Sequence, residues 1–283
     1  MSGCRRQVTR AAIGSHGPAL GDEPDRETST DIQRSGVPRV MGVIQARTGS
    51  TRLPGKVLRP LAGRPVLEWV IRAAQEVRGL DEVVVATTTE PGDDEVERLA
   101  AGLGVRVVRG SVDDVLARFL QAVDGLGVDA IARFTADCPL LDPEVASVVV
   151  GAWRALPSLD HVSTISPRCL PRGLDAEVAS VGALERLAAG LSTPELRHHR
   201  THVTSYLYTH PQDFAVLGVT VHPDASDLRV TLDTPEDLAL IEALVELLGD
   251  RAPAWREVVS ALRQDPSLVA LNAGVLQKRL GQG

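Results

Sequence analysis

The sequence contains few cysteines, few aromatic residues and no long apolar run. Its 283 residues include three cysteines, Cys4, Cys138 and Cys169. An odd number of cysteines without metal-like spacing predicts free thiols in a reducing cytoplasm and argues against a disulfide framework. No apolar run approaches the roughly 20 residues that span a bilayer. We therefore expect no membrane partner.

An excess of positive charge is also lacking. The formal net charge is −7, which gives no general reason to expect nucleic acid as a partner. Hydrophobic residues make up 43% of the chain, enough for a sizeable core. These values predict an ordinary globular protein with one large α/β domain or two modest ones.

Residues 1–38 differ from the rest of the sequence. They lack hydrophobic periodicity and carry five arginines against five acids. The apolar patch at 11–13 is too short for the apolar region of a signal peptide. We predict a disordered leader here, followed by one domain over 39–250 and a helical tail over 251–283.

Cations are concentrated in one loop. After a predicted strand at 40–46, three cationic side chains accompany two glycines that can expose backbone N–H groups to a ligand. The cations are Arg47, Arg52 and Lys56, and the glycines are Gly49 and Gly55. A plain basic turn is the alternative, although turn chemistry explains the glycines but not three cations. The loop matches neither the Walker A motif nor the dinucleotide fingerprint, so we predict a triphosphate site of another kind.

Apolar runs alternate with helical patterns through the first half of the chain. The predicted strands are 40–46, 82–87, 105–108 and 130–134, and the predicted helices are 65–74, 93–103 and 113–123. This order predicts a parallel, doubly wound sheet with right-handed crossovers. Ligands of such sheets bind beyond the carboxyl ends of the strands, where the cationic loop lies.

An aspartate follows the fourth predicted strand at the same edge of the sheet. Asp137 would face the triphosphate, and Mg²⁺ is typically held by one or two carboxylates together with substrate phosphates. The alternative is that Asp137 only starts a turn before Pro139. Asp142 precedes Pro143, and we expect it to cap a helix instead of binding metal.

A second aspartate, Asp233, follows a short predicted strand at 229–232. Thr234 is a predicted helix N-cap, and Asp237 three residues later approaches a capping box. Because Asp233 lies outside that cap, we expect its carboxylate to be free for a metal.

The regular alternation loosens between about 157 and 222. We predict strands at 160–166, 174–181 and 214–221 and a long helix at 195–208. Because this block interrupts the nucleotide-binding pattern, we assign it to the acceptor side of the site and to a subunit contact.

Six stretches carry a resemblance to a known family. They are IQARTGSTRLPGKVL (44–58), VVVAT (83–87), RGSVDDVLARF (109–119), RFTADCPLLDP (133–143), GLDAEV (173–178) and RVTLDTPEDL (229–238). As an ordered set, they resemble the cytidylyltransferases related to CMP-KDO synthetase and the acylneuraminate cytidylyltransferases. The resemblance is strongest to the spore-coat polysaccharide biosynthesis protein F family. No single stretch would be specific enough.

The resemblance implies a GT-A-like nucleotidyltransferase fold, with a three-layer, mostly parallel Rossmann-like sheet. It implies transfer of CMP from CTP to a sugar-acid, phosphate or phosphonate acceptor by a cytoplasmic homodimer, with loss of pyrophosphate. Lys56, Arg47, Asp137 and Asp233 would be catalytic, with Mg²⁺ on the two aspartates. The nucleotide-binding residues would be Ala46, Arg47, Gly49, Ser50, Arg52, Lys56, Ala86, Thr87, Arg109, Ser111 and Asp114, and the acceptor-binding residues Gly173, Asp175, Glu177, Arg200 and His202.

One stretch departs from the family pattern. Where we expect Arg-Glu-His-Val-Thr, the chain has an Arg-Thr-His-Val-Thr run with Thr201 in place of the acid, so we expect different acceptor contacts. His198 and His202 lie one helical turn apart beside His199, and we favour a structural or acceptor-contacting role for them over a zinc site. Two functional alternatives stay open: use of UTP or GTP, and a non-catalytic nucleotide-binding module.

Overall fold

The structure is a computed structural model that describes residues 36–277. Most of the predicted leader therefore lies outside the described residues. The strands are β1 (Val40–Gln45), β2 (Pro60–Leu61), β3 (Arg64–Pro65), β4 (Glu82–Thr88), β5 (Arg106–Gly110), β6 (Ala130–Thr135), β7 (His161–Ser163), β8 (Glu177–Ser180) and β9 (Val216–Gly218). The α-helices are α1 (Val66–Gln75), α2 (Asp94–Gly102), α3 (Val115–Val123), α4 (Pro143–Ala155), α5 (Val181–Gly190), α6 (Arg197–Thr201), α7 (Ser205–Thr209), α8 (Pro235–Leu248), α9 (Trp255–Gln264) and α10 (Pro266–Asn272). Short 3-10 turns lie at Lys56–Leu58, Pro91–Asp93 and Pro194–Leu196.

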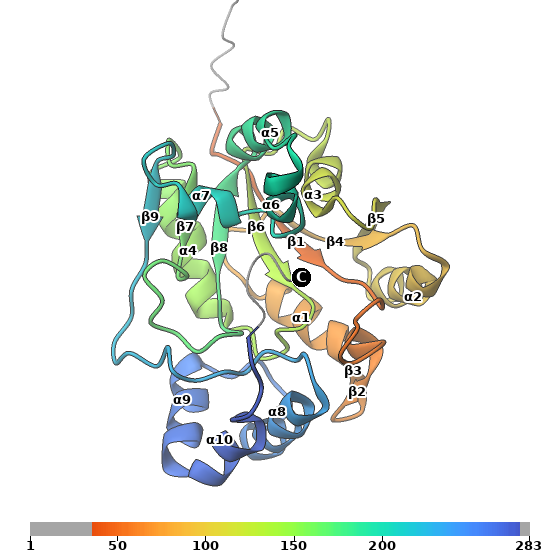
Figure 1. The fold of residues 1–283 in the computed structure, drawn as a ribbon, viewed down its shortest axis with the longest axis vertical. Helices are drawn as coiled ribbons and strands as arrows, with labels where there is room; N and C mark the ends of the chain where they lie inside the picture. Colours follow the sequence, from red (N-terminus) through yellow and green to blue (C-terminus); the bar gives the residue numbers. More distant parts are fainter. Residues whose placement is uncertain (1–35, 278–283) are drawn as a thin grey trace, which may run out of the picture. The chain divides into compact units, whose positions relative to one another are not determined.

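A seven-stranded sheet forms the centre of the fold (Figure 1). Its order is β5-β4-β1-β6-β8-β7-β9, and the first four strands are parallel. β8 runs antiparallel to both β6 and β7. The predicted mostly parallel α/β sheet is confirmed, with the antiparallel pairing confined to the later block.

Helices cover both faces of this sheet. Alternating residues of β1 divide between two apolar clusters, with Met41 and Val43 on one face and Val40 and Ile44 on the other. The first face packs against α3 and α5, and the second against α1 and α4. Strands buried on both faces read as continuous apolar runs, which explains why β1, β4 and β6 were recognisable from sequence.

Two helix starts match their sequence signals. Oδ1 of Asp142 accepts the backbone N–H groups of Glu144 (2.8 Å) and Val145 (3.3 Å), so the predicted cap of α4 is confirmed. Thr234 and Asp237 form the predicted capping box at the start of α8. α8 lies with α9 and α10 as a group of three helices, drawn in blue in Figure 1.

The block at 157–222 contains the main corrections to the predicted elements. The predicted helix at 195–208 is wrong, because the chain breaks between α6 and α7, where Val203 adopts a φ of +43°. The predicted strand at 229–232 is also wrong, since it forms only one isolated bridge, between Arg172 and Arg229. No helix within residues 36–277 is long and apolar enough to cross a membrane.

Candidate active site

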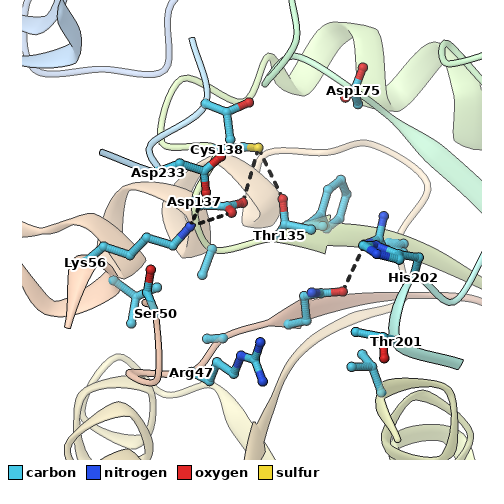
Figure 2. A pocket seen from close by; sticks show the side chains of 18 of the residues that line it. Arg47, Ser50, Lys56, Thr135, Asp137, Cys138, Asp175, Thr201, His202 and Asp233 are labelled. Carbon is cyan, nitrogen blue, oxygen red and sulfur yellow. Dashed lines mark hydrogen bonds and ion pairs between the residues drawn. The ribbon is translucent and has the colours of Figure 1, made fainter. Parts of the chain in front are cut away.

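A cavity of about 850 Å³ opens at the carboxyl ends of β1 and β6 (Figure 2). Of the sequence-predicted residues, those that line it are Ala46, Arg47, Gly49, Ser50, Arg52, Lys56, Asp137, Asp175, Glu177, His202 and Asp233. Thr201, which departs from the family pattern, lines it as well. The structure therefore brings the cationic loop, both aspartates and most of the acceptor set to one cavity.

Lys56 lies between the two aspartates. Its Nζ is 2.8 Å from Oδ2 of Asp137, 2.8 Å from Oδ1 of Asp233 and 2.9 Å from the carbonyl oxygen of Leu232. Burial lowers the pKa of Lys56, but the two carboxylates outweigh it, and the pKa is raised overall. Lys56 therefore remains a cation at neutral pH.

Both aspartates are ionised. Burial raises the pKa of Asp137, but the charge and hydrogen bond of Lys56, together with a hydrogen bond from Thr135, lower it overall. Burial also raises the pKa of Asp233, but its contacts with Lys56, Arg229 and Arg52 together lower it to about 2. Ionised carboxylates are the form that ligates metal ions.

The expectation that the Asp233 side chain is free requires correction. It lies outside the helix cap, as predicted. However, its Oδ2 is 3.0 Å from Arg52 and 2.7 Å from Arg229, in addition to the contact of its Oδ1 with Lys56. Three cations, Arg52, Lys56 and Arg229, therefore surround this carboxylate.

The donor set fits a magnesium ion shared with a nucleotide. Within residues 36–277, no cluster of three or more His, Cys, Asp or Glu side chains could hold a metal by itself. Two ionised aspartates are the protein contribution expected when substrate phosphates supply the remaining ligands. Within residues 36–277, Oδ1 of Asp137 forms no ion pair and lies 3.6 Å from Sγ of Cys138, whereas Oδ2 is paired with Lys56. Oδ1 is thus the oxygen best placed to accept a metal.

The cationic loop is shaped by contacts behind it. Oδ1 of Asp93 accepts hydrogen bonds from the backbone N–H and the hydroxyl of Thr48, both at 2.7 Å. Gly55 adopts a φ of +66° and donates its N–H to the carbonyl of Thr48 at 3.0 Å. The guanidinium of Arg47 lines the cavity and has no hydrogen bond or ion pair within the described part of the chain. The loop thus presents an uncompensated cation.

The side of the cavity formed by β8 and the segment before it contains paired charges and one unpaired cation. Arg168 is ion-paired with Asp175, and Arg133 with Glu177. Burial raises the pKa of Glu177, but Arg133 and other partners lower it to about 2. Arg172 also lines the cavity, and its guanidinium has no hydrogen bond or ion pair among residues 36–277.

Comparisons with known proteins identify the family of this chain. A family model described as cytidylyltransferase matches residues 41–250. The chain belongs to the cytidylyltransferase family. The spore coat polysaccharide biosynthesis protein SpsF of Bacillus subtilis is 32% identical over 80% of this chain and 95% of its own length. An uncharacterized protein of Methanocaldococcus jannaschii is 34% identical over 85% of this chain and 97% of its own length.

Solved structures support the same assignment. A cytidylyltransferase from Leptospira borgpetersenii aligns with a TM-score of 0.77 and 29% identity, covering 82% of this chain and 97% of that one. A CMP:2-keto-3-deoxy-manno-octonic acid synthetase aligns with a TM-score of 0.58 and 19% identity, over 74% of this chain and 99% of that one, and shows the shared fold. The predicted family, nucleotidyltransferase fold and enzyme class are confirmed.

Several predicted site residues of this cytidylyltransferase lie outside the cavity lining. They are Ala86, Thr87, Arg109, Ser111, Asp114, Gly173 and Arg200. Ala86 and Thr87 are buried in β4. Gly173 adopts a φ of +105°, and a Cβ there would lie 2.7 Å from the backbone nitrogen of Thr231. Gly173 thus permits a close approach of two backbone segments. The binding roles of all seven residues stay predictions.

Ion pairs within the fold occupy the charged members of that group. Arg109 pairs with Asp94 and Glu97, each at 2.7 Å. Arg200 pairs with Asp114 at 2.7 Å and so ties α6 to the start of α3. These interactions position the walls of the site.

Sequence reasoning missed other cavity residues in this cytidylyltransferase. They include Arg118, Arg133, Arg168, Arg172, Tyr208 and Gln277. Arg133 interrupts an apolar strand, which was a usable signal, since a cation in a buried strand requires a partner. Gln277 carried no signal, because it reaches the site only through the path of the chain after α10.

The histidine-rich segment forms its own cluster beside the cavity. Nδ1 of His199 is 2.7 Å from the hydroxyl oxygen of Ser205, and its ring lies 3.9 Å from that of His198. Burial, followed by the charges of neighbouring histidines, lowers the pKa of His199 to about 4. His199 is therefore neutral at physiological pH and packs between α6 and α7.

Proposed function

We propose that this cytidylyltransferase transfers CMP from CTP to an anionic acceptor and releases pyrophosphate, with Mg²⁺ as its metal. The observation that carries the proposal is the ionised pair Asp137 and Asp233, which lies beside the cationic loop in one cavity. Two proteins of similar fold support it, because the CMP:2-keto-3-deoxy-manno-octonic acid synthetase binds CTP and a Mycobacterium tuberculosis protein binds manganese.

The proposed reaction is an in-line attack. An acceptor oxygen forms a bond to the α-phosphorus of CTP as the bond from that phosphorus to the bridging oxygen of pyrophosphate breaks. A phosphate or phosphonate oxygen is ionised before it attacks, whereas a sugar-acid hydroxyl releases one proton to solvent. Tyr208 lines the cavity, but burial, followed by the charge of Glu177, raises its pKa to about 12, so we assign it no role as a base.

The chain contributes charge and position. Asp137 and Asp233 would hold Mg²⁺, which when bound would neutralise phosphate charge and orient the α-phosphate. Lys56, Arg47 and Arg52 would offset the charge that develops on the departing pyrophosphate. Because Arg52 is held by Asp233, it would act on the same phosphates as the metal site.

The acceptor side favours a negatively charged molecule. Arg168 and Arg133 already have carboxylate partners, but Arg172 has none among residues 36–277. Burial, followed by the nearby charge of Arg168, lowers the pKa of Arg172, so an anion bound there would relieve an unfavourable environment. A carboxylate, phosphate or phosphonate group of the acceptor would fill this role.

The deciding experiment measures pyrophosphate release with CTP, UTP, GTP and ATP against a panel of sugar acids, sugar phosphates and phosphonates. We expect release that depends on CTP, Mg²⁺ and one acidic acceptor. Turnover with UTP or GTP but not CTP would overturn the choice of nucleotide. Binding of CTP without turnover with any acceptor would favour the non-catalytic alternative.

We also propose that the enzyme is a cytoplasmic homodimer that contacts its partner through the block at 157–222. β9 is one of the two edge strands of the sheet, and Leu217 on it is 37% exposed. Light scattering would measure the molar mass in solution, and a monomeric mass at micromolar concentration would contradict the proposed homodimer. A Leu217→Asp variant should shift a dimer towards the monomer.

A further inference from the structure

Arg118 is a buried cation that the fold leaves only partly satisfied. It lies on α3, lines the cavity, and is only 2% exposed. One guanidinium nitrogen, Nη1, donates to the carbonyl oxygen of Ser111 at 2.9 Å. Its Nε is buried and has no hydrogen-bond partner, and Arg118 forms no ion pair within residues 36–277. A buried donor without a partner costs about 1–3 kcal/mol, so a ligand that accepts from it would recover that energy.

The fold holds Arg118 in a fixed position. A Cβ at Gly110 would lie 2.8 Å from Cγ of Arg118, so the glycine gives the arginine stem its space. The hydroxyl of Ser111 accepts hydrogen bonds from the backbone N–H groups of Asp113 and Asp114, both at 3.2 Å, which fixes the carbonyl that receives Arg118. Ser111 therefore acts as a positioning residue for the guanidinium.

Arg118 lies on the opposite side of β1 from the metal site. α3 contacts β5, β4 and β1, whereas Asp137 follows β6, which pairs with the other edge of β1. Arg172 lies in the segment before β8, and β8 pairs with the edge of β6 that faces away from β1. With phosphates on the loop after β1 and the acceptor beyond β6, the part of the cavity near Arg118 remains for the nucleoside.

The hydrogen-bond donors of Arg118 match cytosine better than uracil. The guanidinium offers parallel N–H donors in a rigid fork. Cytosine presents two adjacent acceptors, O2 and N3, on its Watson–Crick edge, whereas N3 of uracil carries a proton and is a donor. We propose that Arg118 reads the cytosine O2–N3 edge and so selects CTP over UTP. The proposal rests on the proposed use of CTP.

Arg109 is a poorer candidate for this role, although the family resemblance placed it at the nucleotide. Its guanidinium is held by Glu97 and Asp94 and also donates to the backbone carbonyls of Thr88 (2.8 Å) and Glu90 (2.9 Å). Arg118 has one such contact and faces the cavity. Of these two guanidinium groups, the one on α3 is thus the one open to a ligand.

Calorimetric titration with CTP and with UTP in the presence of Mg²⁺ and without acceptor tests the proposal. Wild type should prefer CTP. Arg118→Lys keeps the charge but removes the fork, so the affinity for CTP should fall about 10- to 100-fold while that for UTP changes little. Arg98→Lys, on the exposed surface of α2, is the matched control and should change neither affinity.

The outcomes separate this proposal from the proposed function. A CTP preference that survives in Arg118→Lys overturns the role of Arg118 alone. Equal losses of affinity for CTP and UTP also overturn it, because they assign Arg118 to the phosphates. A wild-type protein that binds UTP as tightly as CTP overturns the choice of nucleotide and the base-reading role together. Each ratio compares nucleotides on one folded sample, so partial unfolding of a variant does not change it.

Discussion

Nζ of Lys56 and Oδ2 of Asp137 lie 2.8 Å apart and join the loop after β1 to the tip of β6. The same nitrogen reaches Oδ1 of Asp233 at 2.8 Å. One lysine therefore keeps two carboxylates close together that would otherwise repel each other. This arrangement makes the site a structural junction, and under the proposed function it is also where the metal and the triphosphate would bind.

Lys56→Met should affect stability and activity together. We expect the free energy of unfolding to fall by up to about 3 kcal/mol, the low end for breaking a buried pair, because the Asp137 side chain is 25% exposed. Pyrophosphate release should fall about 10²- to 10³-fold, since one charge partner of the transition state is lost. Urea unfolding and a pyrophosphate assay measure the two effects.

Magnesium provides a control for the Lys56→Met variant. A divalent cation between the two aspartates would replace the lost charge, so adding Mg²⁺ should raise the melting temperature of the variant more than that of wild type. Equal shifts in the two proteins would contradict the replacement of the lysine charge by a divalent cation, and no shift in either would contradict a cation site at the two carboxylates.

Asp137→Asn should lower pyrophosphate release about 10²- to 10³-fold and leave the fold intact. The substitution keeps the shape of the side chain but removes the charge that Lys56 and a metal would share. Steady-state rates and the circular dichroism spectrum measure the two properties. Near-normal turnover would refute the assignment of Asp137 as a metal ligand.

Asp142→Asn is the matched control for Asp137→Asn. The substituted amide could still cap α4 through its oxygen, but its NH2 group would then face the backbone N–H of Trp255, which Oδ2 of Asp142 accepts at 2.7 Å. We expect a loss of about 1–3 kcal/mol in stability and normal turnover per folded molecule. Asp137→Asn should thus lower turnover and leave the fold intact, whereas Asp142→Asn should lower stability and leave turnover per folded molecule unchanged.

Glu177→Gln should change the pH dependence of stability. The pKa of Glu177 is about 2 in the fold and near 4.5 in an unfolded chain, so the unfolded state binds more protons between these values. The stabilisation from this carboxylate is complete above pH 4.5 and is lost as the pH falls towards 2. Glu177→Gln should therefore be least stable relative to wild type at neutral pH, with the difference shrinking below pH 4.5.

Urea unfolding at several pH values between 2 and 7 would measure the difference between the two proteins. Glu76→Gln, at an exposed position on the protein surface, is the control and should track wild type throughout. A constant difference between Glu177→Gln and wild type across this range would contradict the lowered pKa.

Local signals explain how much of the site was predictable. Parallel strands buried on both faces produce apolar runs, and the residues after these strands meet at one edge of the sheet. The strand order therefore predicted that Lys56 and Asp137 lie close together. The cap at Asp142 was equally local. The sequence could not show that Arg52 and Arg229 would also hold Asp233, because those contacts depend on how distant loops pack.

The failures have long-range causes. A helix over 195–208 looked continuous because no glycine or proline interrupts it after Pro194, yet Val203 adopts a positive φ. At this break, the hydroxyl of Thr204 donates to the buried carboxylate of Glu177 at 2.6 Å. Arg118 was overlooked for a related reason. Its aliphatic stem packs against Gly110, and the helical pattern of α3 does not indicate that contact.

Ala62→Asn should stabilise the protein. Ala62 (φ +47°) and Gly63 (φ +81°) form the two-residue connection between β2 and β3, whose register pairs Leu61 with Arg64. Two positive φ values in such a hairpin loop are typical of a type I′ turn, for which Asn-Gly is strongly preferred. An alanine in this conformation is strained, and asparagine tolerates it better. We expect a gain of about 0.5–1 kcal/mol, or roughly 1–4 °C in melting temperature.

Ala101→Asn tests whether the gain comes from the turn. Ala101 is an exposed residue inside α2, where asparagine is a poorer helix former than alanine. The same chemical change should therefore lower stability there by roughly 0.5 kcal/mol and raise it at position 62. Differential scanning calorimetry on the two single variants would measure both signs. A loss of stability in Ala62→Asn would mean that the hairpin does not hold its left-handed backbone in solution.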